Sequence, residues 1–214
     1  MVNTDSLLQR PGLPPGLRLL VLFKACIWPG DTALQSDLIE RAAGVGLSRS
    51  ELEETILQAT LFFGFPRAVS AFEVLNERWP IDNPPSASGS SEPERMAAGR
   101  QLFASIYGRN DMAVRELLGS FHGEFHDFVL EAAYGRILSR PGLSPRTREI
   151  LAVAALSQLN QWPQLVAHAR GAMHFGASEL DLTETLYTLT RDEGHAVATV
   201  RRLTRLSWPA SDSD

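Results

Sequence analysis

The chain has 214 residues, a formal net charge of −5 at pH 7, 44% hydrophobic residues and one cysteine. A length in this range predicts one large domain or two small ones. A single cysteine excludes an internal disulfide, a CxxC redox pair and a metal site built from several thiolates. The mild acidity argues against nucleic acid as a partner, and we interpret the nineteen-to-one excess of arginine over lysine as coding bias. With no segment typical of a membrane span or signal peptide, we expect a cytoplasmic globular protein.

The segment pattern predicts an all-α fold. Long stretches rich in Ala, Leu and Glu occur without a sustained polar–apolar alternation. Ser48 and Glu51 form a capping box, and the pair Ser144–Pro145 places a cap residue before a proline at the first helical position. Eleven helices are expected, near residues 16–28, 32–44, 49–63, 66–78, 93–108, 110–119, 122–138, 145–159, 161–175, 179–190 and 192–206.

A stretch rich in Pro, Ser and Gly, residues 81–93, divides the chain. Because it has almost nothing to bury, we predict a linker. It separates an N-terminal unit, residues 10–80, from a C-terminal unit, residues 94–206, which has a helical extension at its start. Both ends of the chain, residues 1–9 and 207–214, have little apolar pattern and are expected to be disordered.

An internal repeat relates the two units. When Arg10 is placed on Arg140 and the comparison continues without a gap, residues 10–78 fall on 140–208 with sixteen identities over 69 positions. The motif RPGLPP that starts at Arg10 falls on RPGLSP starting at Arg140, and Gly64 falls on Gly194. Helical bundles share cap and turn signals in any case, but the identities favour duplication of a four-helix unit.

Differences between the repeats indicate where a site would lie. Glu149 and His168 stand where the first unit has Leu19 and Leu38. A carboxylate and an imidazole on adjacent antiparallel helices in an apolar interior can exchange a proton near neutral pH. A buried histidine that only satisfies a buried glutamate is the alternative, and spacing alone favours it.

Two glutamines accompany the predicted histidine. Gln161, Gln164 and His168 are spaced i, i+3, i+7, so one face of a single helix is expected to present all three. This pattern predicts polar groups beside the imidazole.

The other histidines give a weaker signal. His122 and His126 are spaced i, i+4, which suits a metal clip, but the residues between them are not those of HExxH and a third ligand is not evident. We therefore predict no metal, and we expect His126 to face the pocket. The sequence also contains no GxSxG, phosphate-binding loop or dinucleotide fingerprint.

Several motifs together resemble a known family. They are residues 140–151 (RPGLSPRTREIL), His168 nineteen residues after Glu149, and the GASE motif that starts at Gly176. In this order and spacing they are similar to the carboxymuconolactone decarboxylase and alkylhydroperoxidase D superfamily. Residues 99–108 (GRQLFASIYG) are similar to its decarboxylase branch. The resemblance covers about residues 10–80 and 95–205 and implies an all-helical fold of tandem repeats.

The resemblance also separates two chemistries. The peroxidase branch carries two cysteines between its glutamate and its histidine, and Gln161 and Gln164 occupy those positions here. A glutamine has no thiolate, so it can neither attack a peroxide nor form a disulfide. We therefore expect no thiol peroxidase activity.

The decarboxylase branch implies a cofactor-free lyase or isomerase for a small carboxylated or lactone-like substrate. In that reading His168 donates a proton and Glu149 orients it or relays the proton. The polar oxygens of the substrate would bind Gln161 and Gln164. Its carboxylates would be anchored by Arg148 or Arg136.

Two further expectations concern partners. A non-catalytic binding or scaffold protein of the same fold is the alternative function. Because residues 17–27 are apolar on more than one side, we also expect a homo-oligomer, either a trimer or a dimer of tandem chains.

Overall fold

The computed structural model describes residues 4–83 and 89–205, and this part of the chain is helical without strands, which confirms the predicted fold class. The helices are α1 (Thr4–Leu8), α2 (Pro15–Ile27), α3 (Thr32–Ala42), α4 (Arg49–Arg78), α5 (Glu92–Tyr107), α6 (Asp111–Phe121), α7 (Gly123–Phe128), the π-helix η3 (Val129–Leu138), α8 (Pro145–Gln158), α9 (Trp162–His174), α10 (Glu179–Thr190) and α11 (Glu193–Arg205), with short 3-10 turns η1 (Ala43–Val45) and η2 (Gly108–Asn110).

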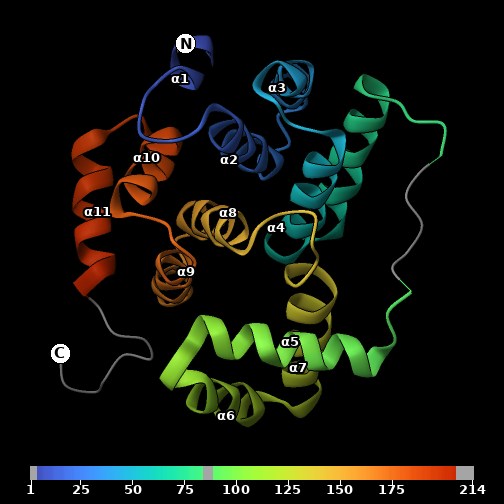
Figure 1. Ribbon diagram of the computed structural model, residues 1–214, viewed down its shortest axis with the longest axis vertical. Coiled ribbons are helices and arrows are strands. Elements are labelled where there is room, and N and C mark those ends of the chain that lie inside the picture. The colour runs from blue at the N-terminus through green and yellow to red at the C-terminus, as the bar shows by residue number, and fades with distance from the viewer. Residues whose placement is uncertain (1–3, 84–88, 206–214) are drawn as a thin grey trace.

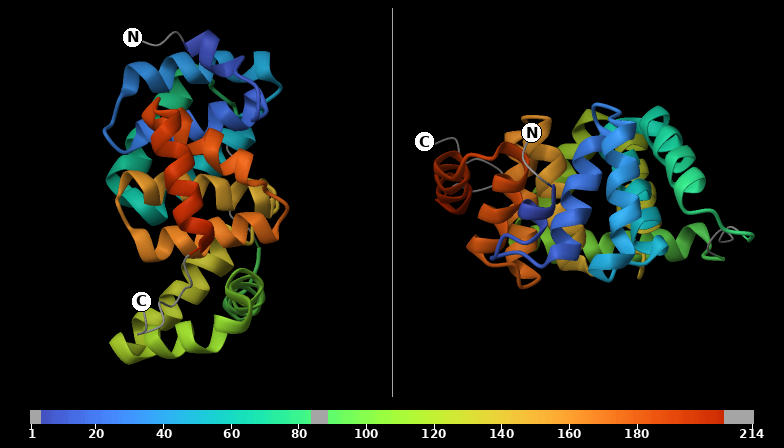
Figure 2. Two further views of the ribbon diagram at one scale, coloured as in Figure 1. Left: turned by 90° about the vertical axis from the view of Figure 1, so that its left-hand side faces the viewer. Right: turned by 90° about the horizontal axis from the view of Figure 1, so that it is seen from above.

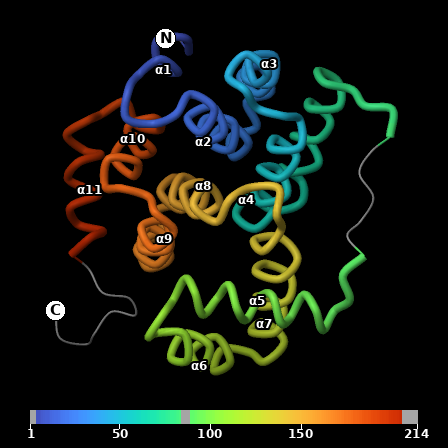
Figure 3. Tube along the Cα trace, viewed as in Figure 1, coloured from blue at the N-terminus to red at the C-terminus, as the bar shows by residue number. Residues whose placement is uncertain are grey.

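Helices α2 and α8 pack against each other at the centre of the main bundle (Figure 1). Helices α3 and α4 surround α2, α9 lies against α8, and α10 contacts both central helices. The chain path in Figure 3 shows that the N-terminal and C-terminal parts interleave in this way. Almost every side chain of α2 is buried, so the chain itself covers the apolar faces of residues 17–27.

Helices α5, α6, α7 and η3 form a second packed layer at one end of the molecule (Figure 2). They have their own core of Phe103, Ile106, Val114, Leu130, Tyr134 and Leu138. Helix α5 and the π-helix come very close, because a Cβ at Gly99 would overlap the carbonyl of Leu130 and one at Gly135 would overlap that of Arg95. Glycine is therefore required on both sides of this contact.

Most of the predicted helix starts are confirmed. The Ser48 hydroxyl accepts a hydrogen bond from the backbone amide of Glu51. In return, the carboxylate of Glu51 accepts one from the backbone amide of Ser48. Ser144 caps α8 with Pro145 in the first turn. The predicted helices 49–63 and 66–78 run on as the single element α4, interrupted at Gly64, whose φ is 77°.

Three details of the sequence prediction are wrong or lie outside the description. Residues 1–9 are not all disordered, because α1 buries Leu7 and Leu8 in the core. The sequence did not predict this helix, since a single helical turn is too short to show an apolar period. The predicted helix 122–138 is divided into α7 and the π-helix. The predicted disordered tail 207–214 lies outside the described residues, as does part of the predicted linker 81–93.

Within the described ranges, no helix has both the length and the apolar character that a membrane crossing requires.

Candidate active site

A carboxylate–imidazole pair joins two packed helices of the C-terminal part. Nδ1 of His168 on α9 lies 2.9 Å from Oε2 of Glu149 on α8. The two residues are only 7% and 2% exposed. An ionised carboxylate can only accept a hydrogen bond, so beside an ionised Glu149 the imidazole carries its proton on Nδ1 and leaves Nε2 for proton exchange. The predicted pairing of these two residues is present in the structure.

Gly171 makes room for this pair. A Cβ at this position of α9, one turn after His168, would overlap Oε2 of Glu149 and approach Cγ2 of Ile106 to 3.2 Å. Any larger residue would therefore displace the carboxylate or the neighbouring α5. Sequence reasoning missed Gly171, whose only signal was its position three places after the histidine.

Sequence reasoning also missed Lys24, the chain's one lysine. It belongs to α2 and is 0% exposed, and its Nζ has no hydrogen-bond partner among the described residues. Burial, together with the charge of Arg148, holds the pKa of this amine well below its ordinary value, and the charge of Glu149 opposes that shift. The signal in the sequence is a single lysine inside an apolar segment, which the interpretation of scarce lysine as coding bias overlooks.

Phe62 connects this amine with the histidine. Nζ of Lys24 lies 4.3 Å from the centre of the Phe62 ring. The imidazole of His168 meets the same ring edge-to-face, with centroids 6.4 Å apart. The N-terminal part of the chain therefore contributes Phe62 of α4 to the surroundings of His168, and Lys24 of α2 contacts that same ring.

Two tyrosines of the second layer lie close enough to Glu149 to feel its charge. The hydroxyl of Tyr134 in the π-helix donates to that of Tyr107 in α5 over 3.2 Å. Burial raises the pKa of Tyr107 to about 12, with an added contribution from the charge of Glu149. Burial likewise raises the pKa of Tyr134 well above its ordinary value. Both hydroxyls therefore stay protonated near neutral pH, and the proton of Tyr107 is left to donate to another group.

A small cavity of about 130 Å³ lies between α5, η2 and α9. Its lining includes neither His168 nor Glu149, although Ala167 directly precedes His168 in α9 and Ile106 lies against Gly171, beside Glu149. The cavity is lined by Ile106, Tyr107, Arg109, Asn110, Ala167 and Arg170. Its wall thus combines apolar groups with two cations.

The structure does not bring the two glutamines to the histidine. Helix α9 begins at Trp162, so Gln161 is the N-cap residue of this helix. The side-chain amide of Gln161 donates a hydrogen bond to the carbonyl of Leu159. Gln161 and Gln164 are both exposed, whereas α9 is buried from Leu165 onward. The expectation that the two glutamines lie in the interior with the imidazole is not supported, because the first turn of α9 lies at the surface.

The predicted arginine anchors are engaged elsewhere. Arg148 is 1% exposed and donates to Oε2 of Glu54 over 2.7 Å. Arg136 is exposed and donates to Glu131 over 3.0 Å. Neither residue lines the cavity beside His168. Spacing alone could not show that Arg148 has a carboxylate partner in a distant part of the chain.

The predicted role of His126 is also not supported. Its Nδ1 lies 2.9 Å from Oδ1 of the neighbouring Asp127. It faces an outer hollow of about 340 Å³ that is formed with Met112, Arg115, Glu116 and Gly119 of α6. This hollow does not include Glu149 or His168. In the described residues, no group of three or more His, Cys, Asp or Glu side chains is arranged to hold a metal.

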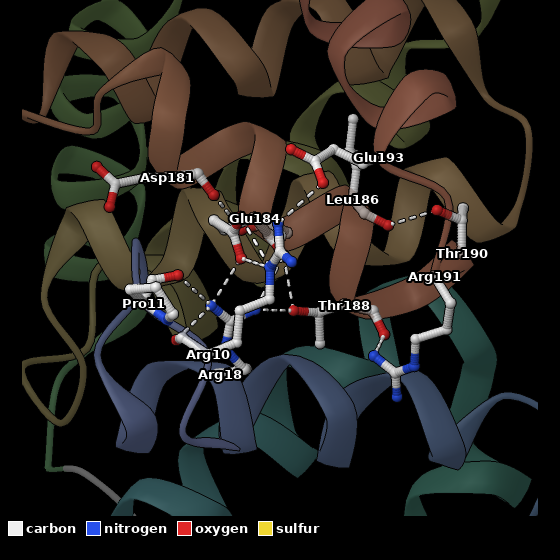
Figure 4. Close-up of polar contacts among 11 residues, drawn as sticks. Arg10, Pro11, Arg18, Asp181, Glu184, Leu186, Thr188, Thr190, Arg191 and Glu193 are labelled. Atoms are coloured by element: carbon white, nitrogen blue, oxygen red, sulfur yellow. Dashed lines mark hydrogen bonds and ion pairs between the residues drawn. The ribbon is translucent and has the colours of Figure 1, made fainter. Parts of the chain in front are cut away.

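Two clusters of ion pairs hold the central helices. Glu184 accepts from Arg10 and Arg18 at 2.9 and 2.8 Å (Figure 4). Glu54 accepts in the same way from Arg140 and Arg148. Burial alone would raise the pKa of either glutamate, but the bonds from the arginines lower both below the ordinary value. The Glu184 cluster joins α2 to α10, and the Glu54 cluster joins α4 to α8, the helix that carries Glu149.

The fold and the site together define an all-helical protein with a buried acid–base pair. The chain's one thiol, Cys26, is buried in α2, where its Sγ donates to the carbonyl of Phe23 and burial raises its pKa, so it is not a thiolate near neutral pH. Residues 123–205 match the carboxymuconolactone decarboxylase family. This match confirms the predicted resemblance to that family and its superfamily.

Three curated relatives are similar to parts of the chain. Peroxisomal protein 2 of Schizosaccharomyces pombe is 25% identical over 132 residues, which cover 60% of this chain and 62% of the relative. 4-Carboxymuconolactone decarboxylase of Acinetobacter baylyi is 27% identical over 97 residues, 45% of this chain and 72% of the relative. Nitrosuccinic acid decarboxylase npaB of Metarhizium robertsii is 32% identical over 60 residues, covering 28% and 42% of the two chains. The chain thus spans less than two thirds of the first and third of these relatives.

Proposed function

We propose that this protein is a cofactor-free lyase or isomerase for a small carboxylated or lactone-like substrate. The observation that carries the proposal is the buried pair of Glu149 and His168, whose Oε2 and Nδ1 lie 2.9 Å apart. Two of the relatives are named as decarboxylases, and both names refer to carboxylated substrates. Their low identity supports a reaction of that kind without fixing the substrate.

The proposed decarboxylation needs a proton donor close to the substrate carbon that becomes a carbanion. Loss of CO2 from a carboxylated lactone leaves an electron pair delocalised into the unsaturated ring, and this carbanion must then be protonated. Nε2 of His168 supplies the proton, while Glu149 holds the imidazole through Nδ1 and stabilises its charged form. The hydroxyl of Tyr107, which accepts from Tyr134, provides a donor near the same carboxylate.

Cations are also needed to hold the carboxylates of such a substrate. Because Arg148 is bound to Glu54 and Arg136 to Glu131, we propose Arg109 of the cavity wall in their place. An arginine can bind a carboxylate through two parallel hydrogen bonds, which fixes orientation as well as charge.

The direct test is to incubate the protein with carboxymuconolactone and to measure CO2 release. We expect His168→Gln to lower the rate about 10²–10⁴-fold, the usual contribution of a positioned acid or base. The matched control is His195→Gln on α11, where the histidine is exposed and bonded to Thr199. Full activity in His168→Gln would contradict the mechanism. No CO2 release from the wild type would contradict this substrate.

A non-catalytic binding or scaffold role is the second candidate. It is favoured by the low exposure of His168, 7%, and by the small volume of the neighbouring cavity, about 130 Å³. Under this alternative the histidine only satisfies Glu149. Calorimetric binding of lactones or carboxylates without turnover would support it over the enzyme.

We propose in addition that the chain contains two copies of one helical unit, residues 10–80 and 94–206. The shift that places Arg10 on Arg140 also places the starts of α2, α3 and α4 on those of α8, α9 and α10. The members of the two ion-pair clusters are related by the same shift.

We also propose a homo-oligomer. The exposed apolar side chains of α6 and α7, which include Met112, Phe121 and Phe128, support it, and light scattering can test it.

A further inference from the structure

We propose that Lys24 is a nucleophilic amine that forms a Schiff base with the carbonyl group of a small β-keto acid. The inference rests on the proposed function, because it uses His168 and Glu149 as the acid–base pair, and it narrows the substrate class to carboxylates that also carry a ketone. It also gives the N-terminal part of the chain a direct role in the chemistry.

The position of the amine is the first argument. Nζ of Lys24 is completely buried and has no hydrogen-bond partner among the described residues. A lysine with a structural role usually extends its ammonium to water or to a carboxylate, because an unpartnered buried charge is costly. The equivalent position in the C-terminal part is Ala154, at the same depth of the partner helix α8, so the packing of these two helices does not in itself require an amine.

The neighbours of the amine give the second argument. Lys24 lies over the ring of Phe62 from α4, and the same ring contacts the imidazole of His168 from α9. The charged groups that act on it come from α8, where Arg148 disfavours the ammonium and Glu149 favours it. Burial is the largest of these influences on the pKa of Lys24, and it favours the neutral amine.

A neutral amine has a free electron pair and can attack a carbonyl carbon. Lysines that are desolvated or placed beside another cation are activated in this way. Lys24 has both features, since it is fully buried and acted on by Arg148. Arginine could not take this role, because its guanidinium stays protonated.

The chemistry balances without a further reactant. The amine adds to the ketone carbon, a C–N bond forms, and water leaves to give a protonated imine. The bond to the β-carboxylate then breaks, CO2 departs, and its electron pair moves toward the imine nitrogen to form an enamine. His168 gives a proton to the carbon that lost CO2. Water then hydrolyses the imine, which releases the ketone and restores the amine of Lys24.

The test is reductive trapping with acetoacetate and sodium cyanoborohydride, followed by intact-mass measurement and peptide mapping. It is unusually clear here, because Lys24 and the α-amino group of Met1 are the chain's only primary amines. We expect Lys24 of the wild type to be modified at pH 7, with the mass of the reduced imine of acetone, the decarboxylated ketone. An ordinary lysine, with a pKa of about 10.4, would be modified slowly at this pH.

Lys24→Met is the matched variant, since methionine fills the same apolar space without an amine. In this variant we expect only the N-terminal amine to be modified, and a melting curve checks that the fold is kept. Modification of Met1 without modification of Lys24 in the wild type would overturn the proposal, including the case in which the reagent never reaches the buried amine.

The two proposals can fail separately. CO2 release from carboxymuconolactone that depends on His168 but persists in Lys24→Met, together with no trapping, would leave the proposed function and remove the amine chemistry. Trapping at Lys24 with no reaction of the lactone would support the amine chemistry and remove that lactone as the substrate.

Discussion

The bundle helices of the N-terminal part and those of the C-terminal part share one framework but differ inside it. In both, an arginine pair is bound by a glutamate from the other part, Arg10 and Arg18 by Glu184 on one side and Arg140 and Arg148 by Glu54 on the other. The shift that places Arg10 on Arg140 relates every member of one cluster to its counterpart in the other. The crossed ion pairs bind the two parts to each other, so neither part completes its own buried network.

The residues of the candidate site lie at positions where the two parts differ. Glu149 and His168 correspond to leucines in the N-terminal part, and Lys24 corresponds to Ala154 in the C-terminal part. The framework residues are equal because both parts need the same packing and the same ion pairs. The candidate site is therefore asymmetric, with its acid–base pair from one part and its amine from the other.

The largest expected effect is the loss of either crossed ion pair. Glu54→Ala leaves Arg148, which is 1% exposed, without its carboxylate, and Glu184→Ala does the same to Arg18, which is 0% exposed. Removal of one partner of a buried pair costs about 3–5 kcal/mol, because the other charge stays buried. Urea unfolding should show losses of this size in both variants. A loss below about 1 kcal/mol in only one of them would break the equivalence of the two clusters.

Acid should weaken both clusters together. The folded pKa values of Glu54 and Glu184 are lowered, so between the folded and unfolded pKa values the unfolded chain binds more protons. Their contribution is complete above the ordinary pKa of about 4.3 and is lost as the pH falls through the folded values. At pH values below about 4.3, we therefore expect the urea concentration at the unfolding midpoint to decrease. The fall should be smaller when both glutamates are replaced by glutamine, and an unchanged fall would assign acid sensitivity to other groups.

Replacement of Gly12 or Gly142, one glycine in each part, should lower the stability of the fold by smaller amounts, which differ between the two positions. A Cβ at Gly12 would lie 2.8 Å from Cγ of Glu184, and one at Gly142 would lie 2.5 Å from Cγ of Glu54. Displacement of these side chains costs typically about 1–3 kcal/mol. Gly12 also has a φ of +89°, which costs a side chain about 1–2 kcal/mol more. Thermal unfolding should therefore show a greater loss for Gly12→Ala than for Gly142→Ala, and the reverse order would count against the backbone argument.

The sequence predicted features that depend on neighbours along the chain. Helix starts at Ser48 and Ser144 followed from local capping chemistry, and the pairing of Glu149 with His168 followed from two adjacent helices. Features set by contacts between distant segments were missed. The engagement of Arg148 by Glu54 and the burial of Lys24 both depend on how α2, α4 and α8 pack, which no local pattern encodes.

The prediction that Gln161 and Gln164 lie in the interior with His168 was not supported, for a related reason. Their spacing relative to His168 was correct as arithmetic, but it assumed that the helix and its burial begin at Gln161. The helix starts one residue later, and its first turn is exposed. Periodicity states which residues share a helix face, whereas the packing of the bundle decides how far along that face burial extends.

The smallest expected effects test whether the correspondence extends to the helix ends. Ser48 caps α4 and Ser178 caps α10, with hydroxyl oxygens 3.3 and 3.1 Å from the amides of Glu51 and Asp181. Replacement of either serine by alanine should cost about 1 kcal/mol, and replacement by glycine only a few tenths. Ser178→Ala should be the more costly, because its cap is part-buried whereas that of Ser48 is exposed. Equal melting temperatures for Ser178→Ala and the wild type would show that the bond from Arg146 to Asp181, 2.7 Å long, holds the start of α10 without the cap.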